Sequence, residues 1–246
     1  MNDTLTIPRR FRGPPDSANG GYACGVVAAF VGTHWSPVEV TLRRPPPLDT
    51  PMRVERGDEE AAVYLGDDLV AEARSVDAVG LDAPAPVDFA DAQSATERSW
   101  IVRELTEHPF PSCFTCGPGR DPGDGQRVFV GPVPGRGLAA APWVPDASLP
   151  TGDGRVAPEI VWAVLDCAGG IGAAYVEGEY EVGAPAVLGR FTAAVTDTPV
   201  VGERCVAAGW RMAQDGRKTF AGSAVFGEDA RLLGLARATW IELRTR

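Results

Sequence analysis

The sequence predicts an α+β fold made of two tandem units, each an antiparallel sheet wrapped around one apolar helix. Two observations predict it: a strand–turn–strand pattern occurs in both halves of the chain, and each half contains one helical stretch almost free of charge. The length of 246 residues fits two units of about 120 residues each. We place the first unit, with its connector, at residues 1–95 and the second at residues 96–246.

The repeated pattern is a hairpin. Residues 62–74 and 223–237 each read as a strand, a turn of Gly, an acidic residue and Asp, and a return strand that ends in Ala-Arg. Gly and Asp supply the positive φ and the local hydrogen bonds of a tight turn. Two further strands precede each hairpin, at 38–44 and 52–56 in the first half and at 186–195 and 204–211 in the second. The order of one helix and four strands therefore occurs twice, which indicates a duplication.

The two helical stretches are apolar on all sides. Residues 20–31 carry no charge, and residues 159–176 carry one charge in mid-helix, Asp166. Because a helix of this kind must be enclosed, we expect each sheet to curl around its own helix. Residues 79–95, rich in Ala, Pro and Asp, are predicted to form a solvated connector between the units.

Asn19-Gly20-Gly21 before the first helical stretch and Asp166 in the second each resemble a different part of one motif of hotdog-fold thioesterases, many of which have His-Gly-Gly at the start of the helix and an acidic residue nine positions after the His. In the first half, Asn19-Gly20-Gly21 is similar to that start, but Ala28 stands at the acidic position. In the second half, Asp166 matches the acidic residue, whereas Ala157 stands at the His position.

Two other segments resemble particular hotdog groups. Residues 113–119 (CFTCGPG) are similar to the lead-in of phenylacetate-pathway-type thioesterases, and the Asn-Gly-Gly-Tyr at 19–22 is similar to the N-terminal unit of bacterial two-hotdog acyl-CoA thioesterases. The resemblance implies a double hotdog, an acyl-thioester substrate, and an active site shared between the two units. Gly20 and Gly21 would then face Asp166, and the reciprocal pairing of Ala28 with Pro158-Glu159 would be inactive.

The catalytic candidates are Asp166, Gly20, Gly21 and Asn19. The free N–H groups and positive dipole end of a helix N-terminus can stabilise a developing oxyanion, and glycine permits close approach. Burial raises the pKa of a carboxyl group, which suits a general base. Two structural alternatives remain open: an ordinary N-cap at Asn19, and a structural Asp166 paired either with a buried arginine, such as Arg190 or Arg237, or with backbone donors.

Substrate-binding candidates are Trp162, one helical turn before Asp166, and Arg43, Arg44 and Lys218, whose charges suit the phosphates of coenzyme A. The alternative is a core role for Trp162 and solvated strand ends for the three basic residues.

No metal or cofactor is predicted. Cys113-x-x-Cys116 with His108 suggests zinc, but a second ligand pair at usable spacing is missing. Cys24 and Cys167 are interpreted as small core residues. Neither His108 nor the only other histidine, His34, lies near the helix motifs, which disfavours a histidine-dependent hydratase.

The formal net charge of −10 argues against binding to nucleic acid or an anionic membrane. The odd number of cysteines and the absence of a secretory signal favour a cytoplasmic location. We therefore expect a thioesterase acting on acyl-CoA or acyl-carrier-protein, in which two chains could pair through sheet edges as a homodimer. The alternatives are a non-catalytic acyl-thioester or lipid-binding protein and a hotdog hydratase or dehydratase.

Overall fold

The first part of the chain contributes one helix and five strands. The structure, a computed structural model, describes residues 3–31, 36–103, 108–181 and 183–243. The elements are β1 (Asp3–Leu5), a short 3-10 helix (Arg9–Phe11), α1 (Gly20–Ala28), β2 (Val38–Leu42), β3 (Met52–Arg56), β4 (Glu60–Leu65) and β5 (Asp68–Ser75). The strands pair side by side in the order β1-β3-β4-β5-β2.

The second part contributes the long strands. They are β6 (Gly131–Val133), β7 (Leu138–Trp143), β12 (Ala186–Val195), β13 (Cys205–Asp215), β14 (Lys218–Phe226) and β15 (Leu232–Glu242), with helix α4 (Pro158–Gly172) between β7 and β12. Two small hairpins, β8 (Thr151–Gly152) with β9 (Arg155–Val156) and β10 (Tyr175–Val176) with β11 (Glu179–Tyr180), flank α4. The order of the main strands is β12-β15-β14-β13-β7-β6.

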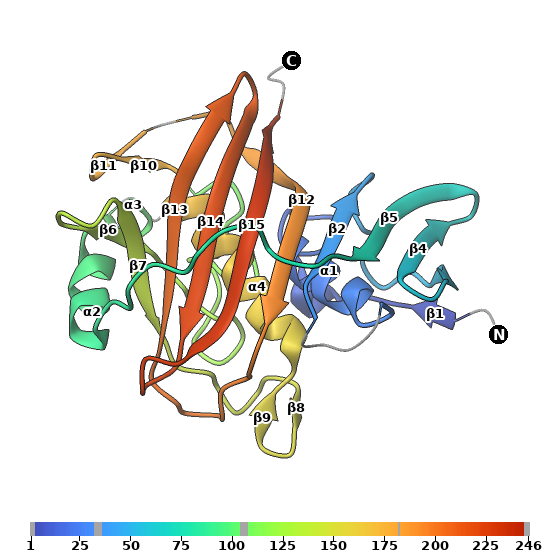
Figure 1. Cartoon of the computed structure of the whole chain (residues 1–246), viewed down its shortest axis with the longest axis horizontal. Coiled ribbons are helices and arrows are strands. Elements are labelled where there is room, and N and C mark those ends of the chain that lie inside the picture. The colour runs from blue at the N-terminus through green and yellow to red at the C-terminus, as the bar shows by residue number, and fades with distance from the viewer. Residues whose placement is uncertain (1–2, 32–35, 104–107, 182, 244–246) are drawn as a thin grey trace.

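The two sets of strands form one continuous antiparallel sheet. They join where β2 pairs with β12, with Thr41 opposite Arg190 and Val38 opposite Ala193. In Figure 1 the long strands β12–β15 run in front of α4, and β1–β5 extend the sheet to one side around α1. Each helix contacts strands of its own half, as expected, but the strands of the two halves are hydrogen-bonded into one sheet across this junction.

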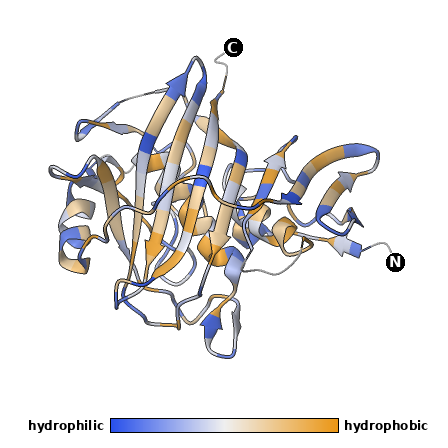
Figure 2. Ribbon diagram, in the orientation of Figure 1, coloured by the Kyte–Doolittle hydropathy of each residue, from blue (hydrophilic) through white to orange (hydrophobic). Residues whose placement is uncertain are grey.

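Helices α1 and α4 pack directly against each other on the enclosed face of the sheet. Both consist mainly of buried residues, which explains the absence of charge read from the sequence (Figure 2). Asn19 begins α1 by accepting a hydrogen bond from the Tyr22 N–H (2.8 Å), and Pro158 occupies the first turn of α4, where no N–H is needed.

Most expected boundaries agree with the structure. The predicted strands 52–56 and 186–195 match β3 and β12 at both ends. The two hairpins are β4–β5 and β14–β15, but their turns differ: Gly66 has the positive φ (61°) in the first, whereas Ala230 (63°) has it in the second. Gly227 in the second turn leaves room for a neighbouring side chain, because a Cβ there would lie 2.5 Å from the Arg231 guanidinium.

Both helices end earlier than expected, at Ala28 and Gly172. The end of α4 is glycine-rich, and a Cβ on Gly172 would lie 2.4 Å from the backbone of Gly209 in β13. Glycines weaken the helix at its end but let it approach the sheet closely. Tyr175 and Val176, predicted as helical, form β10 instead.

Residues 79–95 are mostly exposed, as expected of a solvated connector, but they are more ordered than that expectation implied. Residues 79–88 cross the outer face of β13–β15 (Figure 1), with Val79 and Val87 buried. Helix α2 (Phe89–Glu97) follows and packs on β6 and β7 through its buried Ala92 and Ala95. Because the sheet is covered on both faces here, residues 221–226 of β14 form a continuous buried run instead of alternating. A short helix, α3 (Trp100–Arg103), follows.

No helix among the described residues is long and apolar enough to cross a membrane.

Candidate functional site

Asp166 and the start of α1 meet in the structure. The Gly21 N–H donates a hydrogen bond to Asp166 Oδ2 at 2.8 Å, although the two residues are 145 positions apart. A Cβ on Gly20 would lie 3.4 Å from the same oxygen. The two motif fragments, one from each half of the chain, therefore lie within reach of one bound molecule.

The helices cross so closely at Gly21 that only glycine fits. A Cβ there would lie 2.3 Å from Asp166 Cβ and 2.3 Å from the Trp162 carbonyl oxygen. One turn further along α1, a Cβ on Gly25 would lie 2.7 Å from Glu159 Cα. Because Gly21 contacts the middle of α4 and Gly25 contacts its start, the helices run antiparallel.

Burial dominates the electrostatics of Asp166. Its exposed fraction is 2%, and Oδ1 has no hydrogen-bond partner within the described part of the chain. Burial raises the pKa of this carboxyl group from its ordinary 3.8 to about 8, although the hydrogen bond from Gly21 partly offsets the increase. Neither proposed arginine pairs with Asp166, because Arg190 is exposed and donates to Thr41, and Arg237 lies on the outer face beside Gly80. The other structural alternative, a backbone donor, is present as the Gly21 N–H.

Asn19 connects the start of α1 to a group of cysteines. Its Oδ1 caps the helix, and its Nδ2 lies 3.7 Å from Cys113 Sγ and 3.5 Å from Cys167 Sγ. The side chain is 2% exposed, so both ends of the amide are used inside the protein. Asn19 therefore acts as an N-cap and also donates hydrogen bonds to sulfur.

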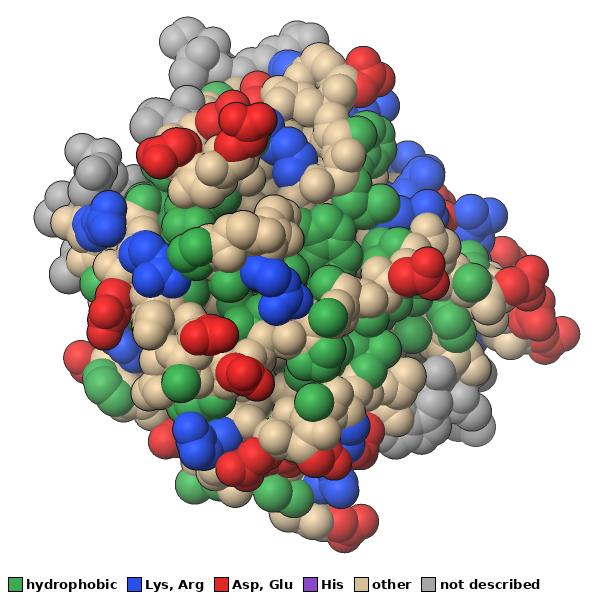
Figure 3. Space-filling model, turned by 60° about the vertical axis from the view of Figure 1, so that its left-hand side comes forward, with side chains coloured by type: hydrophobic (Ala, Val, Ile, Leu, Met, Phe, Trp, Pro, Cys, Tyr) green, Lys and Arg blue, Asp and Glu red, His purple; other side chains and the backbone are tan. Residues whose placement is uncertain are grey.

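A large cavity opens at this point. Its volume is about 1040 Å³, and Asn19, Gly20 and Asp166 form part of its wall together with Cys113, Cys116 and Cys167. Most of the remaining wall is apolar or aromatic and includes Leu42, Trp100, Phe110, Ile171, Leu188 and Trp240. On the face drawn in Figure 3, apolar side chains likewise lie in hollows between scattered charged ones. A cavity of this size and lining suits an acyl group.

The substrate-binding candidates lie in different places. Arg43 and Arg44 line the cavity, and each forms an exposed ion pair, with Glu72 and Asp68 respectively. Lys218 is exposed at the start of β14 and is not part of the cavity wall.

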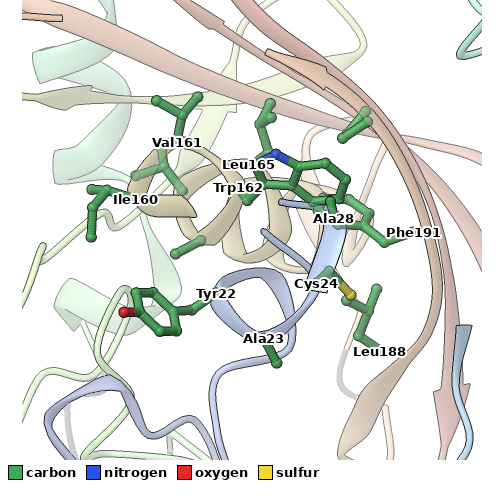
Figure 4. Close-up of a cluster of buried hydrophobic side chains, with 14 of the residues drawn as sticks. Tyr22, Ala23, Cys24, Ala28, Ile160, Val161, Trp162, Leu165, Leu188 and Phe191 are labelled. Atoms are coloured by element: carbon green, nitrogen blue, oxygen red, sulfur yellow. The ribbon is translucent and has the colours of Figure 1, made fainter. Parts of the chain in front are cut away.

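Trp162 belongs to the core, as its alternative interpretation held. It is 4% exposed and packs edge-on against Phe191, with ring centroids 5.5 Å apart. Figure 4 shows it among Ala28, Leu165 and Phe191, between the helices and the sheet. It therefore supports Asp166 from within the core and does not line the cavity.

Three cysteines form a cluster that was not predicted from the sequence. The sulfur atoms of Cys113, Cys116 and Cys167 lie within 4.8 Å of one another, and all three residues are buried. The spacing of Cys113 and Cys116 was visible, but Cys167 was interpreted as a core residue of α4. Its one signal was its position next to Asp166, which did not reveal that residues 113–116 fold back over that helix. Of the histidines, His108 lines the cavity, and His34 lies outside the described residues.

The elements around this site define a class of fold. A long helix enclosed by an antiparallel sheet is the hotdog arrangement that the helix motifs predicted, and the chain has that fold. Solved structures, one of them described as a hotdog-fold protein, match it over almost its whole length.

The tesB protein of Mycobacterium avium subs. paratuberculosis has a TM-score of 0.61 at 12% identity, covering 99% of this chain and 93% of its own. The acyl-CoA thioesterase II TesB2 of Mycobacterium marinum has a TM-score of 0.61 at 11% identity, covering 98% and 93%. A conserved hotdog-fold protein of unknown function from Alicyclobacillus acidocaldarius has a TM-score of 0.58 at 12% identity, covering 99% and 93%. No family model matches the chain, and no curated protein matches it in sequence.

Proposed function

We propose that this chain hydrolyses acyl thioesters at one composite site between two tandem hotdog units. The observation that carries the proposal is the hydrogen bond from the Gly21 N–H to Asp166 Oδ2, at the wall of a large, mainly apolar cavity. The matched solved structures include an acyl-CoA thioesterase II, which supports the same reaction. We propose a boundary between the units just before α2, because α2 crosses residue 95 and packs on β6 and β7.

The geometry gives the two glycines different tasks. Gly21 donates to Asp166 and holds its carboxyl group in place. Gly20 is the first residue of α1, so its N–H has no acceptor within the helix, and it lines the cavity. A thioester carbonyl oxygen placed against the Gly20 N–H would be stabilised as negative charge develops, by about 3 kcal/mol for one such donor.

Asp166 then serves the other half of the reaction. With a pKa of about 8, the carboxylate is a stronger base than an exposed aspartate, and it can take a proton from a water molecule that attacks the carbonyl carbon. The thiol leaves toward the open side of the cavity, where Arg43 and Arg44 lie and where coenzyme A phosphates would meet positive charge. The acyl group occupies the apolar remainder.

The test is thiol release from acyl-CoAs of graded chain length by the wild type, Asp166→Asn and Glu159→Gln. We expect Asp166→Asn to lower kcat/KM by about 10²- to 10⁴-fold, as for loss of a general base. Glu159→Gln is the matched control, because Glu159 contacts Gly25 at the other end of the helix pair and should leave hydrolysis unchanged.

Two results would overturn parts of the proposal. A wild type that binds acyl-CoA but releases no thiol at any chain length would identify a binding protein. Unchanged activity in Asp166→Asn would overturn the assignment of the composite site, although hydrolysis itself would be confirmed.

A further inference from the structure

The cluster of Cys113, Cys116 and Cys167 is built from two separate elements. Cys113 and Cys116 lie in the loop before β6, and Cys167 lies on α4. The Sγ atoms of Cys113 and Cys167 are 3.8 Å apart. The three residues pack with Phe110 and Ile171 as a small group separate from the main core. The sulfur atoms therefore face one another at the cavity wall and do not simply fill space among aliphatic side chains.

The loop that carries Cys113 and Cys116 is held rigidly. The Gly117 N–H donates to the Cys113 carbonyl (2.9 Å), and a Cβ on Gly117 would lie 2.5 Å from the Cys113 backbone. The buried Arg120 donates to the carbonyl groups of Ser112 (2.9 Å) and Arg10 (2.6 Å). These contacts fix the positions of the sulfur atoms without any ion, so the site is preorganised.

Hydrogen-bond donors surround the sulfur atom of Cys113. The Asn19 amide and the backbone N–H groups of Thr115 and Cys116 donate to it. A cysteine that only filled core space would not need donors around its sulfur atom, whereas a metal ligand does.

We propose that Cys113, Cys116 and Cys167 bind one Zn²⁺ ion whose fourth coordination position opens into the cavity beside Asp166. Zinc–sulfur bonds of about 2.3 Å in tetrahedral geometry place two sulfur atoms about 3.8 Å apart, which is the separation of Cys113 and Cys167. Two ligands three positions apart in a tight turn, Cys113 and Cys116, plus a third from a helix, Cys167, form one face of such a tetrahedron.

The fourth ligand comes from the cavity. Among the described His, Cys, Asp and Glu residues, only these three cysteines group closely enough to share an ion. An open position is the mark of a zinc site that binds water or a substrate atom, whereas purely structural sites are closed by four protein ligands. The sulfur atom or the carbonyl oxygen of a bound thioester can occupy this fourth position. The Asn19 amide, which donates to two of the sulfur atoms, would tune the ion as an outer partner.

The test measures metal directly and does not depend on hydrolysis. Full-length protein is stripped with chelator under reducing conditions, loaded with Zn²⁺, passed through gel filtration and analysed by elemental mass spectrometry. We expect one zinc per chain in the wild type and in Cys205→Ala, a control that removes a buried cysteine of the main core. Cys113→Ala and Cys167→Ala should each weaken zinc binding by more than about 100-fold.

Cobalt gives a second measurement on the wild type alone, which covers the case of variants that fail to fold. Co²⁺ in the site should show the visible bands of a tetrahedral ion and a thiolate charge-transfer band, and Zn²⁺ should displace both. Three outcomes overturn the proposal: a wild type that retains no metal, retention equal to the wild type in Cys167→Ala, or a mass lower by two hydrogen atoms that reveals a disulfide among the three cysteines.

Discussion

Replacing Asp166 by asparagine should stabilise the protein, and the gain should grow with pH. The folded state holds this carboxyl group at a pKa of about 8, against an ordinary value of 3.8. A group whose pKa is raised by folding favours the folded state fully only below its unfolded pKa. Its contribution is then lost as the pH rises toward the folded value. The window for Asp166 therefore runs from about pH 4 to pH 8.

The size of the effect follows from the shift. At about 1.4 kcal/mol per pKa unit, burying Asp166 costs about 4 kcal/mol at pH 7 and about 2 kcal/mol at pH 5. Asparagine keeps an acceptor for the Gly21 N–H, but its amide group replaces an oxygen that has no partner, at a pH-independent cost of about 1–3 kcal/mol. The change between pH 5 and pH 7 does not depend on that cost, and at about 1.4 kcal/mol for each of the two pH units it amounts to about 3 kcal/mol.

Thermal unfolding from about pH 4 to pH 8, with chelator present so that the cysteines hold no metal, measures this difference. For a chain of this size, about 3 kcal/mol corresponds to a Tm difference that widens by about 5–10 °C between pH 5 and pH 7. Asp197→Asn is the control, because the hydrogen bond from the Arg231 side chain holds the pKa of Asp197 below its ordinary 3.8, and its contribution is lost only as the pH falls through that range. The Tm difference between the wild type and Asp197→Asn should therefore stay constant between pH 5 and pH 7. Parallel Tm curves for wild type and Asp166→Asn would refute the reasoning.

Two further substitutions test the helix crossing and the cavity mouth. Gly21→Ala places a Cβ 2.3 Å from the Trp162 carbonyl oxygen and should lower the free energy of unfolding by at least about 2 kcal/mol, whereas Gly152→Ala, where a Cβ meets nothing within 4 Å, should be neutral in the same denaturant titration. Arg43→Ala with Arg44→Ala should raise KM several-fold for an acyl-CoA but not for an acyl thioester of a short, phosphate-free thiol; equal changes for both substrates would exclude phosphate binding. Stability should change little, because both ion pairs are exposed.

The sequence predicted the individual helices and strands better than the contacts between them. Local patterns sufficed for β3, β12 and both hairpins, since turn chemistry and strand composition act over a few residues. The charge of Asp166 stood out because every neighbour was apolar, and it lies buried in α4 as that contrast indicated. Its placement against Gly21 came from the resemblance and not from any local pattern.

The remaining features depend on long-range packing. The composition of residues 79–88 is polar enough for a solvated segment. Val79 and Val87 are nevertheless buried, because the segment lies across the outer face of β13–β15. Cys167 joins Cys113 only because the loop before β6 folds back over α4, and no spacing in the sequence encodes that path. Continuity of the sheet likewise depends on the pairing of β2 with β12.

The chemical groups lie at one end of the antiparallel helix pair. The end with Gly21 holds Asp166, Asn19 and the cysteines, while the other end pairs Gly25 with Glu159. An enclosed carboxylate such as Asp166 destabilises the folded state by about 4 kcal/mol at neutral pH. The total free energy of unfolding of a domain is only about 5–15 kcal/mol. A second enclosed carboxylate in place of Ala28 would remove much of what remains. If hydrolysis occurs at the proposed composite site, a single enclosed carboxylate serves the reaction at half the stability cost of two.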